Sequence, residues 1–198
     1  MESAFKRGLF HIIGGLSIFV AAIFMSRIIF LLSLSAFTVI YLCFELIRLR
    51  SSMVNDCFFK NLGPLLRTEE VSRLTGASYI LVSSLLLFVF FRQEIALVAL
   101  SFLIIGDAVS AIVGKYLGRR KFFYRTYEGS AACLVACLII VFLFYIAGIN
   151  ISLPIMLIGA VIAAIAAAMP LRINDNLTIP LLSALAMLIV ELIFKAVV

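Results

Sequence analysis

The sequence contains seven long apolar runs separated by short polar segments. They cover residues 9–26, 28–47, 76–91, 95–117, 130–147, 151–169 and 177–194. Each is near the roughly 20 residues that an α-helix needs to cross the hydrocarbon of a bilayer. The composition agrees, because 65% hydrophobic and 13% charged residues, with a mean hydropathy of +1.26, leave too little polar surface for a water-soluble coat. We therefore predict an all-α, polytopic membrane helix bundle of about seven transmembrane helices, forming a single domain over residues 1–198.

Basic residues indicate the orientation of such a bundle, because they accumulate in cytoplasmic loops. With the N-terminus inside, thirteen of the sixteen Lys and Arg residues fall on the inner side, and Arg27, Arg92 and Lys195 fall on the outer side. We therefore predict a cytoplasmic N-terminus and, from the odd number of spans, an outer C-terminus. The long connection at residues 48–75 mixes charged with apolar residues, which predicts an amphipathic segment at the membrane interface.

Polar side chains within the apolar runs are the first candidates for function, because an ionisable group at membrane depth is costly. On the predicted topology, six of them map to the cytoplasmic halves or ends of their helices: His11, Glu45, Asp107, Glu128, Asp175 and Asn176. Two alternatives stay open, namely His11 as an ordinary interfacial histidine and Glu45 as the ion-pair partner of Arg48, three residues later. Glu191 differs, because it lies near the outer end four residues before Lys195, a spacing that predicts a structural ion pair.

Small residues recur at intervals of four in the densest polar segment, GDAVSAIVGKYLGRRKFFYRTYEGS, at residues 106–130. The stripe consists of Gly106, Ser110, Gly114 and Gly118. Such a stripe lets a second helix, or a ligand, approach the backbone closely. Helix packing and ligand binding are both open interpretations of these glycines.

A cluster of cations follows the stripe, next to the carboxylates of Asp107 and Glu128. It consists of Lys115, Arg119, Arg120, Lys121 and Arg125. Arg and Lys bind phosphate oxygens, and carboxylates hold Mg²⁺, so the pattern suits a polyphosphate with its divalent metal at a lipid boundary. We expect membrane lipids and phosphate-bearing substrates as partners, and no nucleic acid, because the basic residues lie in short loops between apolar runs. The sequence has no Walker A loop, Rossmann fingerprint or metalloprotease motif, which excludes those common sites.

Six motifs together resemble the CTP-dependent lipid-alcohol kinases, the group of dolichol kinase, phytol and farnesol kinases and the yeast-type diacylglycerol kinase. In chain order they are KRGLFH at 6–11, FELIR at 44–48, EEVSRLTGASY at 69–79, GDAVSAIVGKYLGRRKF at 106–122, YEGSAA at 127–132 and INDNLTIPL at 173–181. The resemblance implies transfer of the terminal phosphate of CTP to the hydroxyl of a membrane-embedded lipid alcohol, with Mg²⁺ accompanying CTP. Polyprenols, phytol, geranylgeraniol and diacylglycerol all fit as acceptors.

The resemblance also implies roles for particular residues. The expected catalytic groups are Asp107, Glu128, Asp175 and His11, and the three acids are also the expected metal ligands. The expected nucleotide contacts are Lys115, Arg119, Arg120, Lys121, Arg125, Thr126, Gly114, Gly118 and Asn176. Further polar site candidates are Glu45, Arg48 and Lys6. We expect a cytoplasm-facing site in a multi-pass protein, in a prokaryotic inner membrane rather than an endoplasmic reticulum, and leave the oligomeric state open.

Two alternative functions have specific arguments against them. The central segment also resembles phosphatidate cytidylyltransferase, which makes CDP-lipids, but residues 124–126 read YRT where those enzymes carry SPKKT, and INDNLTIPL stands where they carry HGG and a following DR. Arg125 also departs from the kinase pattern, where Lys is more usual, and this changes the geometry of the cation. A non-enzymatic ion-coupled transporter would place its polar groups near the bilayer midplane, whereas these residues cluster on one side.

Overall fold

The computed structural model describes residues 2–66, 68–122, 125–170 and 173–197, without the side chains of residues 2–7, 122 and 197. The side chain of Lys6 and all of Arg172 therefore lie outside the described part. The chain is 85% helical, which confirms the all-α class. It divides into two compact units, Met1–Leu85 and Leu86–Val198, and each is described by itself. The single domain stays a prediction.

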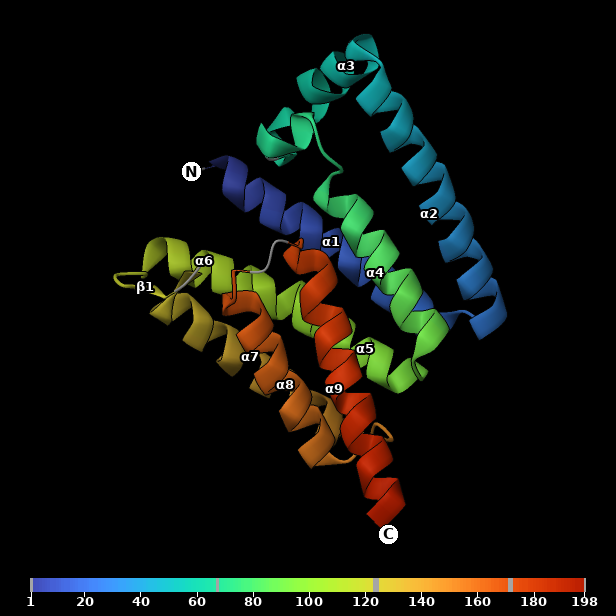
Figure 1. Cartoon of the computed structure of the whole chain (residues 1–198), viewed down its shortest axis with the longest axis vertical. Coiled ribbons are helices and arrows are strands. Elements are labelled where there is room, and N and C mark those ends of the chain that lie inside the picture. The colour runs from blue at the N-terminus through green and yellow to red at the C-terminus, as the bar shows by residue number, and fades with distance from the viewer. Residues whose placement is uncertain (1, 67, 123–124, 171–172, 198) are drawn as a thin grey trace. The chain divides into compact units, whose positions relative to one another are not determined.

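The first unit consists of helices and two short 3₁₀ turns (Figure 1). Its elements are α1 (Glu2–Phe24), α2 (Arg27–Arg50), α3 (Ser52–Leu62), η1 (Gly63–Leu65), η2 (Thr68–Val71) and the start of α4 (Gly76–Phe90). Ser51 separates α2 from α3, and its hydroxyl accepts a hydrogen bond from the Val54 N–H at 3.5 Å, as expected for a helix N-cap. α3 packs on α2, and η1 packs on α1.

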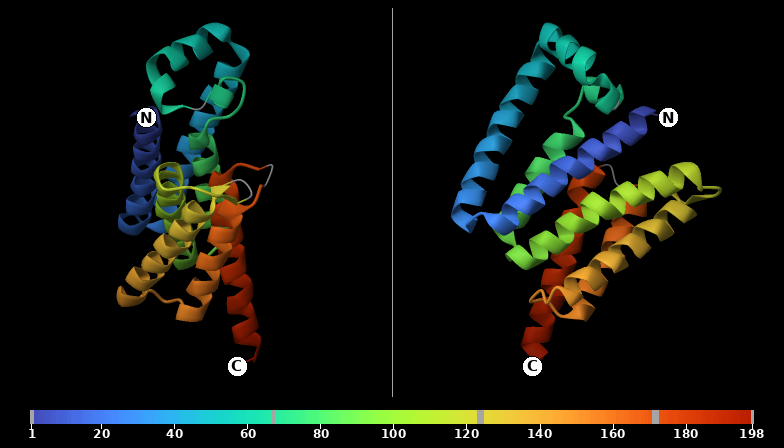
Figure 2. Two further views of the ribbon diagram at one scale, coloured as in Figure 1. Left: turned by 90° about the vertical axis from the view of Figure 1, so that its left-hand side faces the viewer. Right: turned by 180° about the vertical axis from the view of Figure 1, so that it is seen from behind.

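The second unit contains one long central helix made of three consecutive segments. These are α5 (Gln93–Ser101), the π-helical segment η3 (Phe102–Asp107) and α6 (Ala108–Tyr116). A hairpin follows, in which β1 (Lys121–Phe122) pairs antiparallel with β2 (Arg125–Thr126). The unit ends with α7 (Tyr127–Ile146), α8 (Leu153–Ala168) and α9 (Asp175–Val197). α7 packs on α6 and α8, α8 packs on α9, and α9 also contacts α5 (Figure 2).

Local sequence determines where these helices begin and end. Thr126 caps α7, because its hydroxyl accepts a hydrogen bond from the Gly129 N–H at 3.1 Å. At the other end of α7, Gly148 has a φ of 71°, and its N–H donates to the Tyr145 carbonyl at 3.1 Å. This is the left-handed glycine stop of a helix C-terminus. Asn174 immediately precedes α9 and caps its N-terminus, because its Oδ1 accepts a hydrogen bond from the Asn176 N–H at 3.0 Å.

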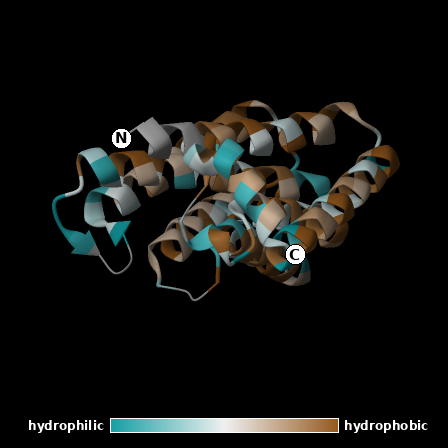
Figure 3. Cartoon of the chain, turned by 90° about the horizontal axis from the view of Figure 1, so that it is seen from above, coloured by the Kyte–Doolittle hydropathy of each residue, from teal (hydrophilic) through white to brown (hydrophobic). Residues whose placement is uncertain are grey.

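The helices carry apolar surfaces of membrane type. Four are long and apolar enough to cross a bilayer: Arg27–Arg50, Gln93–Tyr116, Tyr127–Ile146 and Asp175–Ala196. Three shorter apolar helices cover Gly8–Phe24, Gly76–Phe90 and Leu153–Ala168. Each of the seven predicted apolar runs therefore corresponds to one helix, and Figure 3 shows the hydrophobic colours, brown and tan, over much of the helical ribbon. Seven spans and a cytoplasmic N-terminus stay predictions.

Candidate functional site

A π-helical segment positions Asp107. η3 ends at this residue, inside the otherwise continuous helix Gln93–Tyr116. The segment is held by the fully buried side chains of Phe102 and Leu103. A π turn contains an extra residue and so changes the direction in which the following side chains point, and such segments occur frequently at functional sites. The sequence predicted a helix here and missed its π-helical geometry.

Three side chains from separate elements of the second unit meet beside this segment. The Nη2 atom of Arg125, in β2, donates to Oδ1 of Asp107 and to Oδ2 of Asp175, the latter at 2.9 Å. Its Nε donates to the Ala167 carbonyl at 2.9 Å, and its Nη1 donates to Oγ of Ser110 at 3.1 Å. Arg125 thereby joins α6, the end of α8 and the start of α9. Asp107 and Asp175, both predicted to lie on the cytoplasmic side, thus lie beside each other, and the cytoplasmic location stays a prediction.

The Arg125 cluster, as we call Asp107, Ser110, Arg125 and Asp175, is largely shielded from solvent. The three charged side chains are 13–15% exposed. Burial by itself lowers the pKa of the Arg125 guanidinium, but the carboxylates of Asp107 and Asp175 outweigh burial and raise that pKa above its ordinary value. Arg125 is therefore a permanent cation. Within the described ranges, the two carboxylates therefore share this one guanidinium.

The glycines of the sequence stripe pack α6 closely against the start of α7. A Cβ atom at Gly114 would lie 3.0 Å from Oγ1 of Thr126, and one at Gly118 would lie 2.7 Å from its Cγ2. A Cβ at Gly129 would lie 2.9 Å from the Ser110 carbonyl oxygen. The contacts support the helix-packing interpretation of the stripe. Nucleotide binding by Gly114 and Gly118 stays a prediction.

The five cations of the predicted phosphate-binding set do not share one environment. Lys115, Arg119, Arg120 and Lys121 are exposed around the hairpin, and Figure 3 colours its strands as hydrophilic. Arg125 alone among the five is largely buried and ion-paired with carboxylates. The sequence alone does not distinguish Arg125 from the other four cations, because the burial of a side chain cannot be derived from a run of cations in a loop.

Glu128 does not join Asp107 and Asp175 in a compact group of acids. Within the described ranges there is no cluster of three or more His, Cys, Asp or Glu side chains suited to a metal ion. The Oε2 atom of Glu128 is buried and has no hydrogen-bond partner among the residues that the structure describes. Thr126 caps α7, and Asn176 is buried in the first turn of α9. Their predicted roles in catalysis and nucleotide binding stay predictions.

The remaining polar candidates belong to the first unit. His11 lies half-buried in α1. Glu45 and Arg48 are fully buried and form a two-pronged ion pair, with Nε to Oε1 at 3.1 Å and Nη2 to Oε2 at 3.0 Å. Arg48 also donates to the carbonyls of Glu70 and Arg73, at 3.1 and 2.8 Å. The ion-pair interpretation of Glu45 is confirmed, and the pair anchors the loop before α4.

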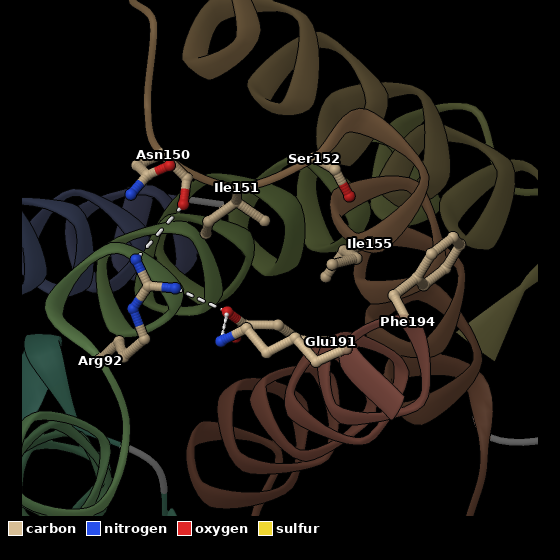
Figure 4. Close-up of a pocket in the computed structure, with 8 residues that line it drawn as sticks. Arg92, Asn150, Ile151, Ser152, Ile155, Glu191 and Phe194 are labelled. Atoms are coloured by element: carbon tan, nitrogen blue, oxygen red, sulfur yellow. Dashed lines mark hydrogen bonds and ion pairs between the residues drawn. The ribbon is translucent and has the colours of Figure 1, made fainter. Parts of the chain in front are cut away.

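A second charged cluster lies at the opposite end of α9 from Asp175 (Figure 4). Oε1 of Glu191 forms ion pairs with Nη1 of Arg92, at 2.6 Å, and with Nζ of Lys195, at 2.8 Å. These side chains line a pocket of about 610 Å³ together with apolar residues that include Ile155 and Phe194. The predicted Glu191–Lys195 pair is confirmed, and Arg92, from a distant part of the sequence, joins it.

Sequence reasoning missed two residues that the geometry makes important. Ser110 appeared only as a small residue of the stripe, but it is buried and accepts a hydrogen bond from Arg125. Arg92 appeared only as an outer-loop cation, but it binds a residue 99 positions away. The spacing of Ser110, three residues after Asp107, is a usable signal, because helix positions i and i+3 share a face. No local signal pairs Arg92 with Glu191.

The fold and the cluster together define an apolar helical protein with a carboxylate–guanidinium centre at one end of its second unit. No protein-family profile and no solved structure matches the chain. The chain is 28% identical over 182 residues to an uncharacterized protein of Rickettsia prowazekii, with 89% of each chain covered. It is 27% identical over 184 residues to the CTP-dependent diacylglycerol kinase 1 of Saccharomyces cerevisiae, covering 81% of this chain. The chain spans 63% of the length of that kinase. The similarity supports a relationship to the broad group of CTP-dependent lipid kinases.

Proposed function

We propose that the chain is a membrane kinase that transfers the terminal phosphate of CTP to the hydroxyl of a lipid alcohol. The observation that carries this proposal is the convergence of Asp107 and Asp175 on the buried cation of Arg125, in a chain similar to a CTP-dependent diacylglycerol kinase. Phosphoryl transfer requires positioned charge more than covalent chemistry by the protein, and the cluster provides such charge beside apolar helices.

The two carboxylates of the cluster fit a divalent cation. One oxygen from each of Asp107 and Asp175 already converges on a single cationic nitrogen. Mg²⁺ is commonly held by one or two carboxylates together with substrate phosphates and water, so two acids are sufficient without a third. We propose that Asp107 and Asp175 hold the Mg²⁺ of Mg²⁺–CTP, which would neutralise charge on the transferred phosphate.

The exposed cations around the hairpin suit the phosphate chain of CTP. Lys115, Arg119, Arg120 and Lys121 are exposed to solvent at this end of α6 and would attract and orient the nucleotide. The alcohol oxygen would then attack the terminal phosphorus while the bond to the bridging oxygen breaks, giving a lipid phosphate and CDP. The hydroxyl proton passes to a carboxylate of the site.

The apolar helices suit a lipid acceptor that reaches the site from the bilayer. Four helices are long enough to span it, and the lipid hydroxyl would lie at the membrane surface, where CTP arrives from the cytoplasm. Diacylglycerol is the first acceptor to examine, because the similar yeast kinase is named for it. Phytol, geranylgeraniol and longer polyprenols complete the chemical class. A prokaryotic inner membrane is the proposed location.

The experiment supplies the purified chain in lipid nanodiscs with Mg²⁺ and CTP labelled either at the α or at the γ phosphate. Each candidate alcohol and phosphatidic acid is offered separately, with ATP as the competing donor. The proposal expects γ label, and no α label, in a lipid phosphate, with CTP a better donor than ATP. An α-labelled CDP-lipid from phosphatidic acid would assign a cytidylyltransferase instead, and no labelled product from any acceptor would refute both enzymes.

A further inference from the structure

A single nitrogen atom of Arg125 occupies the point where two carboxylates meet. Nη2 contacts Oδ1 of Asp107 and Oδ2 of Asp175. These two acids come from different helices, 68 positions apart in sequence. Two carboxylates that close together repel each other unless a cation lies between them. The Arg125 guanidinium is that cation in this structure.

We propose that Arg125 is a resident counter-cation that exchanges with a divalent metal ion. It holds Asp107 and Asp175 together before the nucleotide binds, and it leaves them when a divalent cation occupies the same carboxylates. The released guanidinium is then free for the phosphates of CTP, a second step that rests on the proposed function. Arg125 therefore acts as a positioning residue for the two acids and competes with the metal for them.

The charges favour such an exchange. Counted over these three groups alone, two carboxylates and one guanidinium carry a net charge of −1, and a divalent cation in place of the guanidinium brings that sum to zero. Guanidinium and metal together would place three positive charges beside two negative ones in a poorly solvated position. A guanidinium and a metal ion bound to the same carboxylates would repel each other strongly, because the effective dielectric constant in such a position is low. The nucleotide supplies the additional anions that the displaced Arg125 needs.

The neighbours of Arg125 permit it to leave. Among the residues that the structure describes, its hydrogen-bond partners besides the two acids are one hydroxyl, Ser110 Oγ at 3.1 Å, and one carbonyl, that of Ala167 at 2.9 Å. A neutral hydrogen bond contributes only about 0.5–1.5 kcal/mol net, so the carboxylates supply most of the attraction. A rotation of the long side chain suffices for the exchange. The planar fork also explains why Arg fits here, because Lys has no second and third nitrogen for Ser110 and Ala167.

The direct test measures Mn²⁺ binding by electron paramagnetic resonance in the full-length chain, with the metal alone and without nucleotide or lipid alcohol. The proposal expects Arg125→Gln to bind Mn²⁺ at least tenfold more tightly than the unsubstituted chain, because the competing cation is gone. Arg120→Gln is the matched control, since it removes the same charge from an exposed side chain of the same region. Its affinity should change less than threefold.

Thermal unfolding provides a second readout that a merely structural arginine would not change. Without metal, Arg125→Gln should melt at a lower temperature, because Asp107 and Asp175 then lose the cation that lies between them. Mg²⁺ should restore most of this loss, and should raise the melting temperature of Arg125→Gln more than that of the unsubstituted chain. If Arg125→Gln does not fold, Arg125→Lys keeps the charge without the fork and should show an intermediate gain in Mn²⁺ affinity.

The outcomes separate this inference from the proposed function. Unchanged or weaker Mn²⁺ binding in both Arg125 variants, or a thermal loss that Mg²⁺ does not restore, would overturn the exchange and leave the kinase assay unaffected. Conversely, tighter Mn²⁺ binding in a chain that phosphorylates no lipid would support the exchange of cations and refute the kinase.

Discussion

Replacing Asp107 by Asn separates a catalytic carboxylate from a structural one. Removal of one partner from a buried ion pair commonly costs roughly 3–5 kcal/mol, because an uncompensated charge stays behind. Here Arg125 keeps Asp175 at 2.9 Å and the Ala167 carbonyl at 2.9 Å. The Asn amide oxygen can still accept the Nη2 hydrogen bond. We therefore expect Asp107→Asn to lower the free energy of unfolding by only about 1 kcal/mol, the value of one hydrogen bond.

The same substitution should reduce activity far more than stability. If Asp107 holds the metal that neutralises the transferred phosphate, its loss removes electrostatic stabilisation that is strongest in the transition state. A decrease in kcat of roughly 10² to 10⁴ corresponds to about 2.7–5.5 kcal/mol. The expected loss in transition-state stabilisation is thus several times the expected loss in folding stability.

The assay measures γ-phosphate transfer and thermal unfolding on the same preparation, over a range of Mg²⁺ concentrations. Glu191→Gln is the control, because Glu191 is also an ion-paired acid but lies at the other end of α9, with Arg92 and Lys195. It should lower the melting temperature and leave kcat within about threefold, since a surface-connected pair is worth about 1 kcal/mol. An Asp107→Asn variant with normal kcat, or one that loses activity only by unfolding, would remove Asp107 from the catalytic set.

Three further predictions address topology and packing. Thiol labelling of Lys121→Cys and Lys195→Cys in intact vesicles should modify them from opposite faces of the membrane, and labelling of both from one face would contradict the proposed orientation. Arg48→Gln should destabilise the chain by roughly 3–5 kcal/mol in chemical unfolding, because it strands a fully buried carboxylate; a loss below about 1 kcal/mol would contradict this. Gly129→Ala places a Cβ 2.9 Å from a backbone oxygen of the facing helix and should cost about 1–3 kcal/mol. Gly14→Ala, with open space around it, should be neutral or stabilising.

The sequence was sufficient for the helices, because hydrophobic runs of fixed length are set by local composition. Each of the seven runs corresponds to one helix. The i, i+4 spacing correctly predicted the Glu191–Lys195 pair, and the i, i+3 spacing offered the Glu45–Arg48 pair as one of two interpretations, which the structure supports. These predictions worked because helical periodicity alone brings the partners together.

The sequence was insufficient for the centre of the candidate site, because that centre depends on contacts between distant segments. Asp107, Arg125 and Asp175 lie on three elements, and only the folded chain brings Asp175 to the same nitrogen as Asp107. The π-helical turn before Asp107 has no composition signal that we could recognise. The glycine stripe was visible, but the choice between a packing surface and a ligand surface required the positions of Thr126 and Gly129.

The number of bound carboxylates distinguishes Arg48 from Arg125. Arg48 binds one carboxylate, that of Glu45, and donates its remaining hydrogen bonds to amide and carbonyl oxygens. Arg125 binds two carboxylates from different helices through one nitrogen. A structural pair needs only one acid, since each buried charge costs desolvation energy. Two carboxylates that converge on one point, beside exposed cations, are what the proposed site for a metal and a polyphosphate requires, because the acids can hold the metal and the cations can bind the phosphates.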